Sequence, residues 1–345
     1  MKYTTLPNTD IKVSKICLGT MTWGNQNTET EGHEQMSYAL DQGVNFFDVA
    51  ELYPVPADAK TYGDTERIIG TWFNKTNNRD KVVLATKIAG SGDYTAHIRK
   101  DGFSKKAIKE AVEGSLKRLQ TDYIDLYQLH WPERGVNCFG VRDYPYRTSA
   151  KEAENHLEIL EILNDYVKQG IIKHIGLSNE TPWGTMKYLQ ASEQHNLPRP
   201  VTIQNSYSLI HRAYEYGMSE VSLRENIGLL AYSPLAFGVL SGKYLGGNKP
   251  QDARVTLFPN YNRYSSSQSL RAVEKYQEIA QKNDLTLVEL SLSYVNQLPF
   301  VTSNIIGATK MSQLKENINS IHVELSKDIL NEIESVHRLI PNPAP

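Results

Sequence analysis

Four side chains, placed at the ends of three expected strands, have the chemistry of a proton-donor site. The run NFFD (45–48) ends at Asp48, and Tyr53 follows in the next loop. The run VVLATK (82–87) ends at Lys87, and the strand in YIDLYQLHWP ends at His130. Enzymes with parallel sheets carry their chemistry outside the carboxyl ends of the strands. The sequence therefore predicts that Asp48, Tyr53, Lys87 and His130 meet in one site.

The four residue types suggest how a proton would be delivered. A free phenol has a pKa of about 10 and gives up its proton reluctantly at neutral pH. Lys87 follows an apolar run, so it should be buried and needs a carboxylate, for which Asp48 is the candidate. We expect the Lys87 ammonium to lower the pKa of Tyr53, Asp48 to keep Lys87 charged, and His130 to hydrogen-bond the reacting oxygen. This chemistry suits carbonyl reduction, with the hydride supplied by a cofactor.

Each of the four residues also has a structural explanation when it is considered alone. Asp48 is compatible with a helix cap, Tyr53 with a packed aromatic ring, Lys87 with a surface lysine and His130 with a core histidine. A different catalytic use of Lys87, as the Schiff base of a barrel aldolase, is also open. That alternative leaves Tyr53 without a role.

The elements that must position these residues alternate between strand and helix. Strands are expected at 15–19, 45–48, 82–87, 123–129, 174–179, 201–205, 227–234 and 302–308, after a small hairpin over 3–13. Eight strands separated by helices predict a (β/α)8 TIM barrel. The rival is an open doubly wound sheet, which would normally carry a glycine-rich phosphate loop that the sequence lacks.

Helices and long loops fill the intervals. Helices are expected near 31–42, 64–74, 108–119, 152–169, 182–194, 216–225, 268–282 and 312–319, with Ser104 as one cap and a capping box of Thr286 and Glu289 opening another. A final amphipathic helix spans 326–338, and the proline-rich tail 340–345 is expected to fray. Long loops after strand four (133–150) and strand seven (237–267) have the length of functional loops.

Composition narrows the class of protein. The 345 residues are 40% apolar and 22% charged, which is typical of an ordinary soluble globular protein, and the net charge of −2 argues against a nucleic-acid or acidic-membrane partner. Cys17 and Cys138 form neither a disulfide framework nor a metal pair, and no metal is expected. The amino terminus has no continuous apolar stretch. We expect one cytoplasmic barrel domain over 1–345, of unknown oligomeric state.

A series of motifs along the whole chain resembles the aldo-keto reductases. In order, they are LGTMTWG, FDVAELY, the lysine after strand three, LYQLHWP, IGLSN, IQNSYS, YSPLAFGVLSGKY and IIGATKMSQLKENI. The resemblance implies a (β/α)8 barrel that binds NADP(H) across the strand ends without a Rossmann fold. It also implies that Tyr53 is the general acid, that Lys87 and Asp48 tune it, and that His130 positions the carbonyl. The opening motif and the insert after strand four are most similar to the bacterial Tas-type branch, related to the β subunits of voltage-gated potassium channels.

The same resemblance implies the cofactor positions. At the nicotinamide end it places Gly19, Thr20, Met21 and Asp48, with Ser178, Asn179 and Gln204 on the carboxamide and Tyr232 stacked on the ring. Around the pyrophosphate it places Ser233, Pro234, Leu235, Ala236, Gly238, Leu240, Ser241 and Lys243. At the adenosine and its 2′-phosphate it places Gly307, Thr309, Gln313, Glu316 and Asn317, before a helix N-terminus that suits an anion.

One departure from the family pattern concerns the 2′-phosphate. Many members of the family have an arginine at the position of Gln313, whereas this chain resembles the channel β subunits in having a glutamine there. The positive charge would then have to come from Lys243, Lys310 or Arg254. NADPH is the expected cofactor and an aldehyde or ketone the expected substrate. Aromatic residues suited to the walls of a small-molecule pocket, or to packing their own loops, are Trp23, Trp131, Tyr144 and Tyr146. The competing function is a cofactor-sensing binding module with little turnover.

Overall fold

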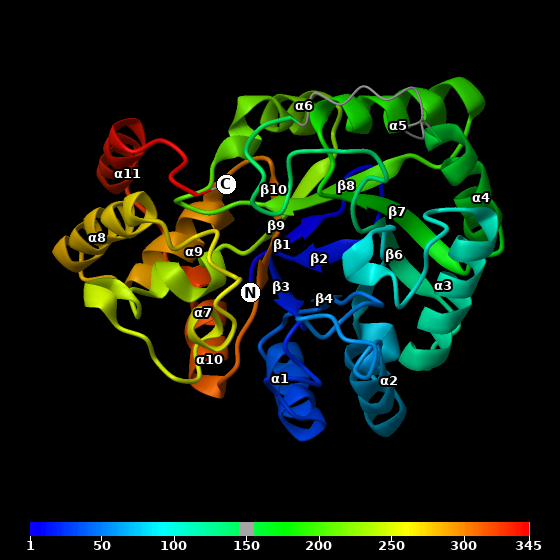
Figure 1. The fold of residues 1–345 in the computed structure, drawn as a ribbon, viewed down its shortest axis with the longest axis horizontal. Helices are drawn as coiled ribbons and strands as arrows, with labels where there is room; N and C mark the ends of the chain where they lie inside the picture. The colour runs from blue at the N-terminus through cyan, green and yellow to red at the C-terminus, as the bar shows by residue number, and fades with distance from the viewer. Residues whose placement is uncertain (145–154, 345) are drawn as a thin grey trace.

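A computed structural model describes residues 1–144 and 155–344, and within them eight parallel strands close into a barrel (Figure 1). The strands are β3 (Ile16–Gly19), β4 (Phe46–Asp48), β5 (Val83–Ile88), β6 (Ile124–Leu129), β7 (Ile172–Ser178), β8 (Pro200–Ser206), β9 (Gly228–Tyr232) and β10 (Val301–Ile306). They pair in chain order, and β10 pairs with β3 to close the ring. The predicted (β/α)8 barrel is confirmed, and the open doubly wound sheet is excluded.

Closure between β3 and β10 requires a close approach at Gly19. A Cβ at this position would lie 2.9 Å from the Ile306 carbonyl oxygen, so only glycine fits without a shift of the backbone. Gly19 also pairs with Asp48 on β4. The end of β3 is therefore held directly beside the strand that carries the predicted carboxylate.

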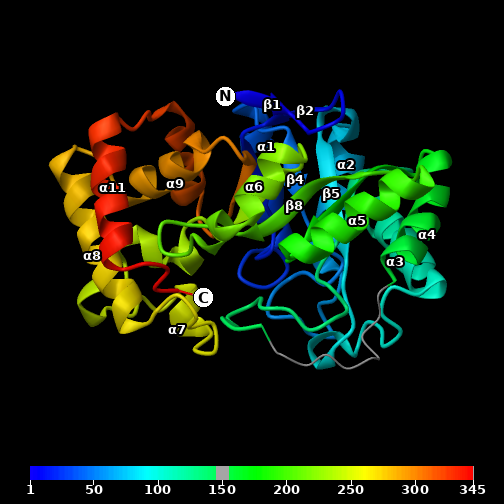
Figure 2. The ribbon, with the colours of Figure 1, turned by 90° about the horizontal axis from the view of Figure 1, so that it is seen from above.

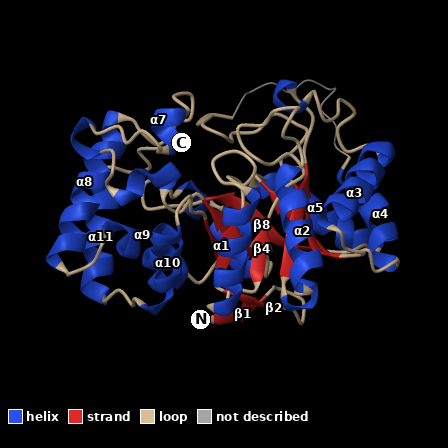
Figure 3. Cartoon of the chain, turned by 90° about the horizontal axis from the view of Figure 1, so that it is seen from below, coloured by secondary structure: helices blue, strands red, loops and turns tan. Residues whose placement is uncertain are grey.

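The amino-terminal hairpin, β1 (Tyr3–Thr5) and β2 (Lys12–Ser14), is confirmed and lies at one end of the barrel. Figures 2 and 3 show it at the end opposite to the long loops that follow β6 and β9. Leu6 and Val13 of this segment are fully buried against barrel residues such as Phe46 and Leu126. The hairpin thus closes the bottom of the barrel and leaves the carboxyl ends of the strands as the open end.

Helices surround the barrel on its outer side. They are α1 (Glu29–Asp41), α2 (Asp64–Thr76), α3 (Lys105–Leu119), α4 (His156–Lys168), α5 (Pro182–His195), α6 (Met218–Arg224), α7 (Arg254–Leu257), α8 (Ser267–Lys282), α9 (Leu287–Gln297), α10 (Met311–Asn319) and α11 (Lys327–Leu339). The predicted caps are confirmed: Ser104 Oγ accepts from the Ala107 N–H, and Thr286 and Glu289 form a capping box. The start of the predicted helix at 152–154 and part of the loop 133–150 lie outside the described residues.

The prediction that the carboxy-terminal tail frays is wrong for residues 341–344. The Ala344 N–H donates to the Ile210 carbonyl at 3.2 Å, and the Arg212 N–H donates to Asn342 Oδ1 at 2.6 Å. Ala344 is buried, and Pro343 accepts hydrogen bonds from Arg142 and other side chains. A proline-rich composition favours fraying only where the chain finds no partners, and this tail finds them on the loop after β8.

None of the helices in residues 1–144 and 155–344 combines the length and the apolar character needed to cross a membrane.

Candidate active site

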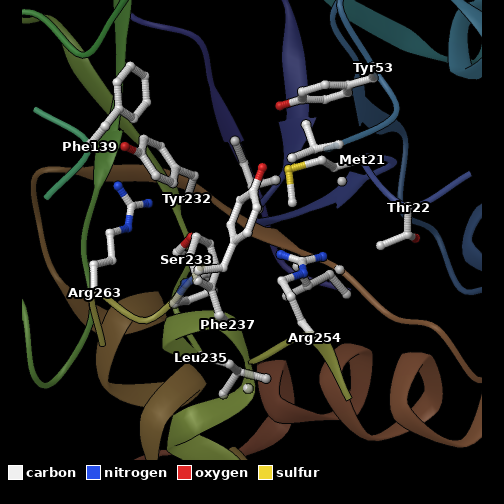
Figure 4. A pocket seen from close by; sticks show the side chains of 18 of the residues that line it. Met21, Thr22, Tyr53, Phe139, Tyr232, Ser233, Leu235, Phe237, Arg254 and Arg263 are labelled. Atoms are coloured by element: carbon white, nitrogen blue, oxygen red, sulfur yellow. The ribbon is translucent and has the colours of Figure 1, made fainter. Parts of the chain in front are cut away.

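A cavity of about 1500 Å³ opens at the carboxyl ends of the barrel strands. Its lining includes the ends of β3, β4, β7, β8, β9 and β10, and the loops that follow β5, β6 and β9. Figure 4 shows Tyr53, Tyr232, Arg254 and Arg263 around this space. The predicted strand-end residues Asp48, Tyr53 and His130 all line it.

The predicted ion pair between Lys87 and Asp48 is confirmed. Lys87 Nζ donates to Asp48 Oδ2 and to the Val49 carbonyl oxygen, each at 2.7 Å. Both side chains are buried, with exposed fractions of 0% for Lys87 and 2% for Asp48. Because a buried charge must be paired and hydrogen-bonded, the two residues fix each other at the base of the cavity.

The second carboxylate oxygen of Asp48 is held by two amides. Gln204 Nε2 donates to Oδ1 at 2.7 Å and Gln128 Nε2 at 3.2 Å, and Gln204 also donates to Gln128 Oε1. The resemblance placed Gln204 on the carboxamide, whereas its amide nitrogen here contacts Asp48. Gln128 was not predicted from the sequence. It precedes His130 by two residues, and residues two apart along a strand point to the same face.

Tyr53 lies beside both Lys87 and His130. Lys87 Nζ is 5.1 Å from the centroid of the Tyr53 ring, and the rings of Tyr53 and His130 meet edge to face at a centroid distance of 5.9 Å. The four predicted residues are thus brought together. The expectation of a lowered phenol pKa is wrong in this structure: burial, and then the Asp48 carboxylate, hold the pKa of Tyr53 well above its ordinary value. The charge of Asp48, which lies 2.7 Å from the Lys87 ammonium, acts on the phenol in the direction opposite to that of the ammonium.

His130 is held as a neutral imidazole. Burial, and then the charge of Lys87, keep its pKa well below the ordinary value. The ring Nδ1 is buried, with no hydrogen-bond partner among the described residues, so a ligand would have to approach the other ring nitrogen, Nε2. The ring packs on Trp131 at 4.9 Å between centroids. A neutral His130 can donate one hydrogen bond without bringing a second positive charge beside Lys87.

A buried ion pair between Glu51 and Arg99 holds the loop that carries Tyr53. Glu51 accepts from the Ala89 N–H at 2.6 Å and from Arg99 Nη2 at 2.8 Å, and its own N–H donates to the Lys87 carbonyl at 3.2 Å. These contacts tie the segment after β4 to the end of β5. Sequence reasoning missed this pair, although an acidic residue inside the apolar motif FDVAELY was a usable signal.

The residues expected around the nicotinamide form a connected network. Asn179 Nδ2 donates to the His130 carbonyl at 2.9 Å, and Asn179 Oδ1 accepts from the Tyr232 hydroxyl at 2.7 Å. Ser178 Oγ donates to the Gln204 carbonyl at 2.8 Å. Thr20 Oγ1 donates to the Asp48 carbonyl at 2.8 Å. The ends of β3, β4, β6, β7, β8 and β9 are therefore cross-linked around one side of the cavity.

The loop after β9 contains three residues other than glycine with positive φ. Ser233, Ala236 and Phe237 have φ of 55°, 49° and 58°, a region that residues other than glycine rarely occupy. Such strain is retained where the surrounding structure requires it, and it clusters at ligand sites. A Cβ on Gly238 would lie 2.7 Å from Lys243 Cε, so the glycine leaves room for this side chain.

Two cations on this side of the cavity have no carboxylate partner within the described chain. Lys243 and Arg254 both line the cavity, and burial lowers the pKa of each. Lys310 also lines it and pairs with Asp252 across the mouth at 2.5 Å. Lys243 and Arg254 are half-buried, and cations withdrawn from water without a partner are costly, so this arrangement fits a ligand with several negative charges. The dinucleotide phosphates of the expected cofactor meet that requirement.

The residues expected at the adenosine lie at the start of α10. The Thr309 N–H donates to Gln313 Oε1 at 3.0 Å, and Asn317 Nδ2 donates to the Gly307 carbonyl at 3.1 Å. Glu316 accepts from Thr286 Oγ1 at 3.0 Å. The helix has no side-chain cap, so its first N–H groups remain for an anion.

Most of the remaining predicted cofactor residues line the cavity, and two do not. Those that do are Gly19, Met21, Ser233, Pro234, Leu235 and Ser241. Ala236 and Leu240 are instead fully buried in the core behind the loop.

The predicted aromatic walls divide in the same way. Trp131 lines the cavity. Trp23 does not: it is fully buried, and its Nε1–H donates to Gln35 Oε1 at 3.1 Å. Tyr144 is exposed and is not part of the described lining, and Tyr146 lies outside the described residues. Because its large surface is mostly apolar, a tryptophan side chain is as suited to a core as to a pocket wall. Which of the two it occupies depends on the path of its loop in the folded protein.

The lining residues that sequence reasoning missed include Gln26, Phe237 and Arg263. Gln26 Oε1 is buried without a partner in the described structure, Phe237 lies between charged groups, and Arg263 has a buried Nε that is likewise unpaired. Gln26 follows LGTMTWG by two residues, which was a signal for it. The other two lie in the long loop after β9, where sequence spacing does not determine side-chain position.

Comparison with known proteins supports the family resemblance. Residues 15–338 match the family described as "Aldo/keto reductase family". The chain is 49% identical to "Protein tas" of Escherichia coli (strain K12), over 100% of both chains. It is 34% identical to "Uncharacterized oxidoreductase YrpG" of Bacillus subtilis (strain 168), over 97% of this chain and 96% of that protein. It is 31% identical to "Probable voltage-gated potassium channel subunit beta" of Oryza sativa subsp. japonica, over 97% and 96% respectively.

These matches span the barrel and its site together, and they agree with the resemblance to the Tas-type branch. The chain belongs to the aldo/keto reductase family of oxidoreductases.

Proposed function

We propose that this chain is an NADP(H)-dependent carbonyl reductase that converts aldehydes or ketones to alcohols, with Tyr53 as general acid. The observation that carries the proposal is the convergence of the Tyr53 phenol, the buried Lys87–Asp48 pair and the neutral His130 ring at one end of a single cavity. The same cavity is lined by cations suited to phosphates.

The residues present fit a nicotinamide dinucleotide. Ser178, Asn179 and Tyr232 would hold the nicotinamide side, and Lys243 and Arg254 the phosphates, with the start of α10 at the adenosine. When bound, the reduced cofactor supplies the hydride. The buried Gln26 Oε1, which has no partner among the described residues, is a further acceptor for it.

The proton path follows from the positions of the side chains. His130 Nε2–H would hydrogen-bond the carbonyl oxygen and fix it beside the Tyr53 hydroxyl. As negative charge develops on that oxygen, the Tyr53 Oη–H bond breaks and the proton moves to it. Lys87 then stabilises the phenolate, and Asp48 keeps the ammonium in place. The raised pKa of Tyr53 ensures that the donor is protonated before the reaction.

The direct test is the Tyr53→Phe variant. We expect it to bind NADPH as tightly as the parent, measured by fluorescence titration, and to lose aldehyde reduction by about 100-fold or more. Turnover equal to the parent would show that Tyr53 is not the acid. Lys87 trapped covalently on substrate by borohydride would instead support an aldolase.

The binding-module alternative makes a different prediction for the parent protein. It requires tight NADPH binding with negligible turnover over a broad aldehyde panel. Parallel titrations with NADPH and NADH test the preference for NADPH. That preference depends on Lys243, Arg254 and Lys310, because Gln313 stands where many family members have an arginine.

A further inference from the structure

Arg263 is a cavity cation that the proposed cofactor contacts do not use. Of the other cations in the lining, Arg134 pairs with Glu180 and Lys310 with Asp252, whereas Lys243 and Arg254 are the two assigned to the cofactor phosphates. No carboxylate within residues 1–144 and 155–344 forms an ion pair with Arg263, and its buried Nε has no hydrogen-bond partner there. A side chain with five donors is thus held at the cavity wall without an anion.

Aromatic rings fix the Arg263 guanidinium without neutralising it. Its Cζ lies 4.8 Å from the ring centroid of Tyr264, 4.9 Å from that of Phe237 and 5.9 Å from that of Tyr232. Contacts of this kind restrict the side chain, and apart from a hydrogen bond with the Tyr232 side chain they leave its donors available for an anion. The arginine is therefore prepared to bind a planar anion with little loss of conformational freedom.

Arg263 shares the Phe237 ring with Arg254, a cation assigned to the cofactor phosphates: the two Cζ atoms lie 4.9 and 5.3 Å from the ring centroid. Figure 4 shows Arg263 beside Tyr232 and Arg254 on the other side of the cavity. Arg254 is grouped with Lys243, Asp252 and Lys310, which lead towards the start of α10. Arg263 lies close to the loop after β6: a Cβ placed on Gly140 of that loop would be 3.6 Å from the Cβ of Arg263.

A row of aromatic rings connects the catalytic end to this loop. The His130 ring packs on Trp131 at 4.9 Å, and Trp131 meets Phe139 edge to face at 5.9 Å. Phe139 directly precedes Gly140, next to Arg263. A substrate with its carbonyl at Tyr53 and His130 would lay an apolar body along these rings and reach the guanidinium with its far end.

We propose that Arg263 binds a carboxylate of the substrate, so that this protein prefers aldehydes or ketones that carry a carboxylate beyond a ring-sized apolar body. The inference rests on the proposed carbonyl reductase function. It makes Arg263 a specificity-determining residue, because it contacts the far end of the substrate and no reacting atom.

The test compares 4-carboxybenzaldehyde with its neutral methyl ester in the parent and in Arg263→Met. The parent should favour the acid, and the variant should lower the acid-to-ester ratio of kcat/KM by about 10- to 100-fold, the range for losing a hydrogen bond to a charged group. The loss should appear in KM. Arg263→Lys, which keeps the charge without the fork, should fall between the two.

Binding measurements separate this inference from the proposed function. With NADP⁺ present, 4-(hydroxymethyl)benzoate should bind the parent more tightly than Arg263→Met by calorimetry, while the Kd of NADPH stays at the parent value in the variant. Arg254→Met is the contrast, because it should raise the Kd of NADPH. An unchanged acid-to-ester ratio together with equal carboxylate binding, or a raised Kd of NADPH in Arg263→Met, would overturn the inference. A parent that reduces neither probe would contradict the proposed function, and carboxylate binding would still decide the role of Arg263.

Discussion

Replacement of Lys87 by methionine tests the physical basis of the site most directly. The change keeps the length of the side chain and removes the ammonium, which donates two hydrogen bonds of 2.7 Å to Asp48 Oδ2 and the Val49 carbonyl. Asp48 is 2% exposed, so water cannot replace the lost donor. Its Oδ1 keeps the amides of Gln128 and Gln204, but the negative charge is left uncompensated.

The expected loss is large because one partner of a buried pair remains charged. Breaking such a pair from one side costs about 3 to 5 kcal/mol of unfolding free energy. Adding Asp48→Asn removes the stranded charge. We therefore expect the double variant to be more stable than Lys87→Met alone, by about 2 kcal/mol.

Equilibrium unfolding in urea at neutral pH measures both effects. Tryptophan fluorescence and far-UV circular dichroism should give coincident curves, which is the condition for a two-state analysis. The coupling energy of the Asp48–Lys87 cycle then follows from the parent, the two single variants and the double variant. A Lys87→Met loss below about 1 kcal/mol, the level of an exposed pair, would refute the reasoning, as would a double variant less stable than Lys87→Met.

Three further changes test the surroundings of the site. Arg99→Met leaves the buried Glu51 carboxylate without its cation, and should lower the unfolding free energy measured in urea by about 3 to 5 kcal/mol. Asn342→Ala removes the acceptor of the Arg212 N–H at 2.6 Å, and should cost about 1 to 3 kcal/mol in the same assay. Burial, and then two neighbouring cations, lower the pKa of His156 to about 4 from the ordinary 6.5. The unfolded chain therefore takes up the proton first as pH falls, and Tm should drop between about pH 6.5 and 4, less steeply in His156→Gln.

Matched controls distinguish these effects from general damage. Arg67→Met breaks an exposed pair with Asp64 and should cost no more than about 1 kcal/mol. Asn331→Ala removes an exposed side chain from α11 and should leave stability nearly unchanged. If Arg99→Met lowered the free energy of unfolding no more than Arg67→Met does, the claim that Glu51 is a buried charge dependent on Arg99 would be contradicted. A parallel pH dependence of Tm in the parent and in His156→Gln would assign the acid loss to other groups.

The sequence alone determined the barrel and the meeting of the four proton-site residues. Strand and helix periods are local, and a parallel barrel brings successive strand ends to one rim, so Asp48, Lys87 and His130 had to be neighbours. The same local logic predicted the caps at Ser104 and Thr286. The need of a buried lysine for a carboxylate predicted its pair with Asp48.

Only the tertiary structure decided how the loops and charges combine. Whether Trp23 faces the core or the cavity, and whether the tail at Ala344 docks, depends on contacts between distant segments. The direction of the Tyr53 pKa shift depends on how deeply the phenol is buried and on the full set of charges around it: burial, and then Asp48, raise the pKa where the sequence predicted that Lys87 would lower it. Arg263 comes to the cavity because a long loop folds back over the barrel, and loop paths are set by packing rather than by local residue patterns.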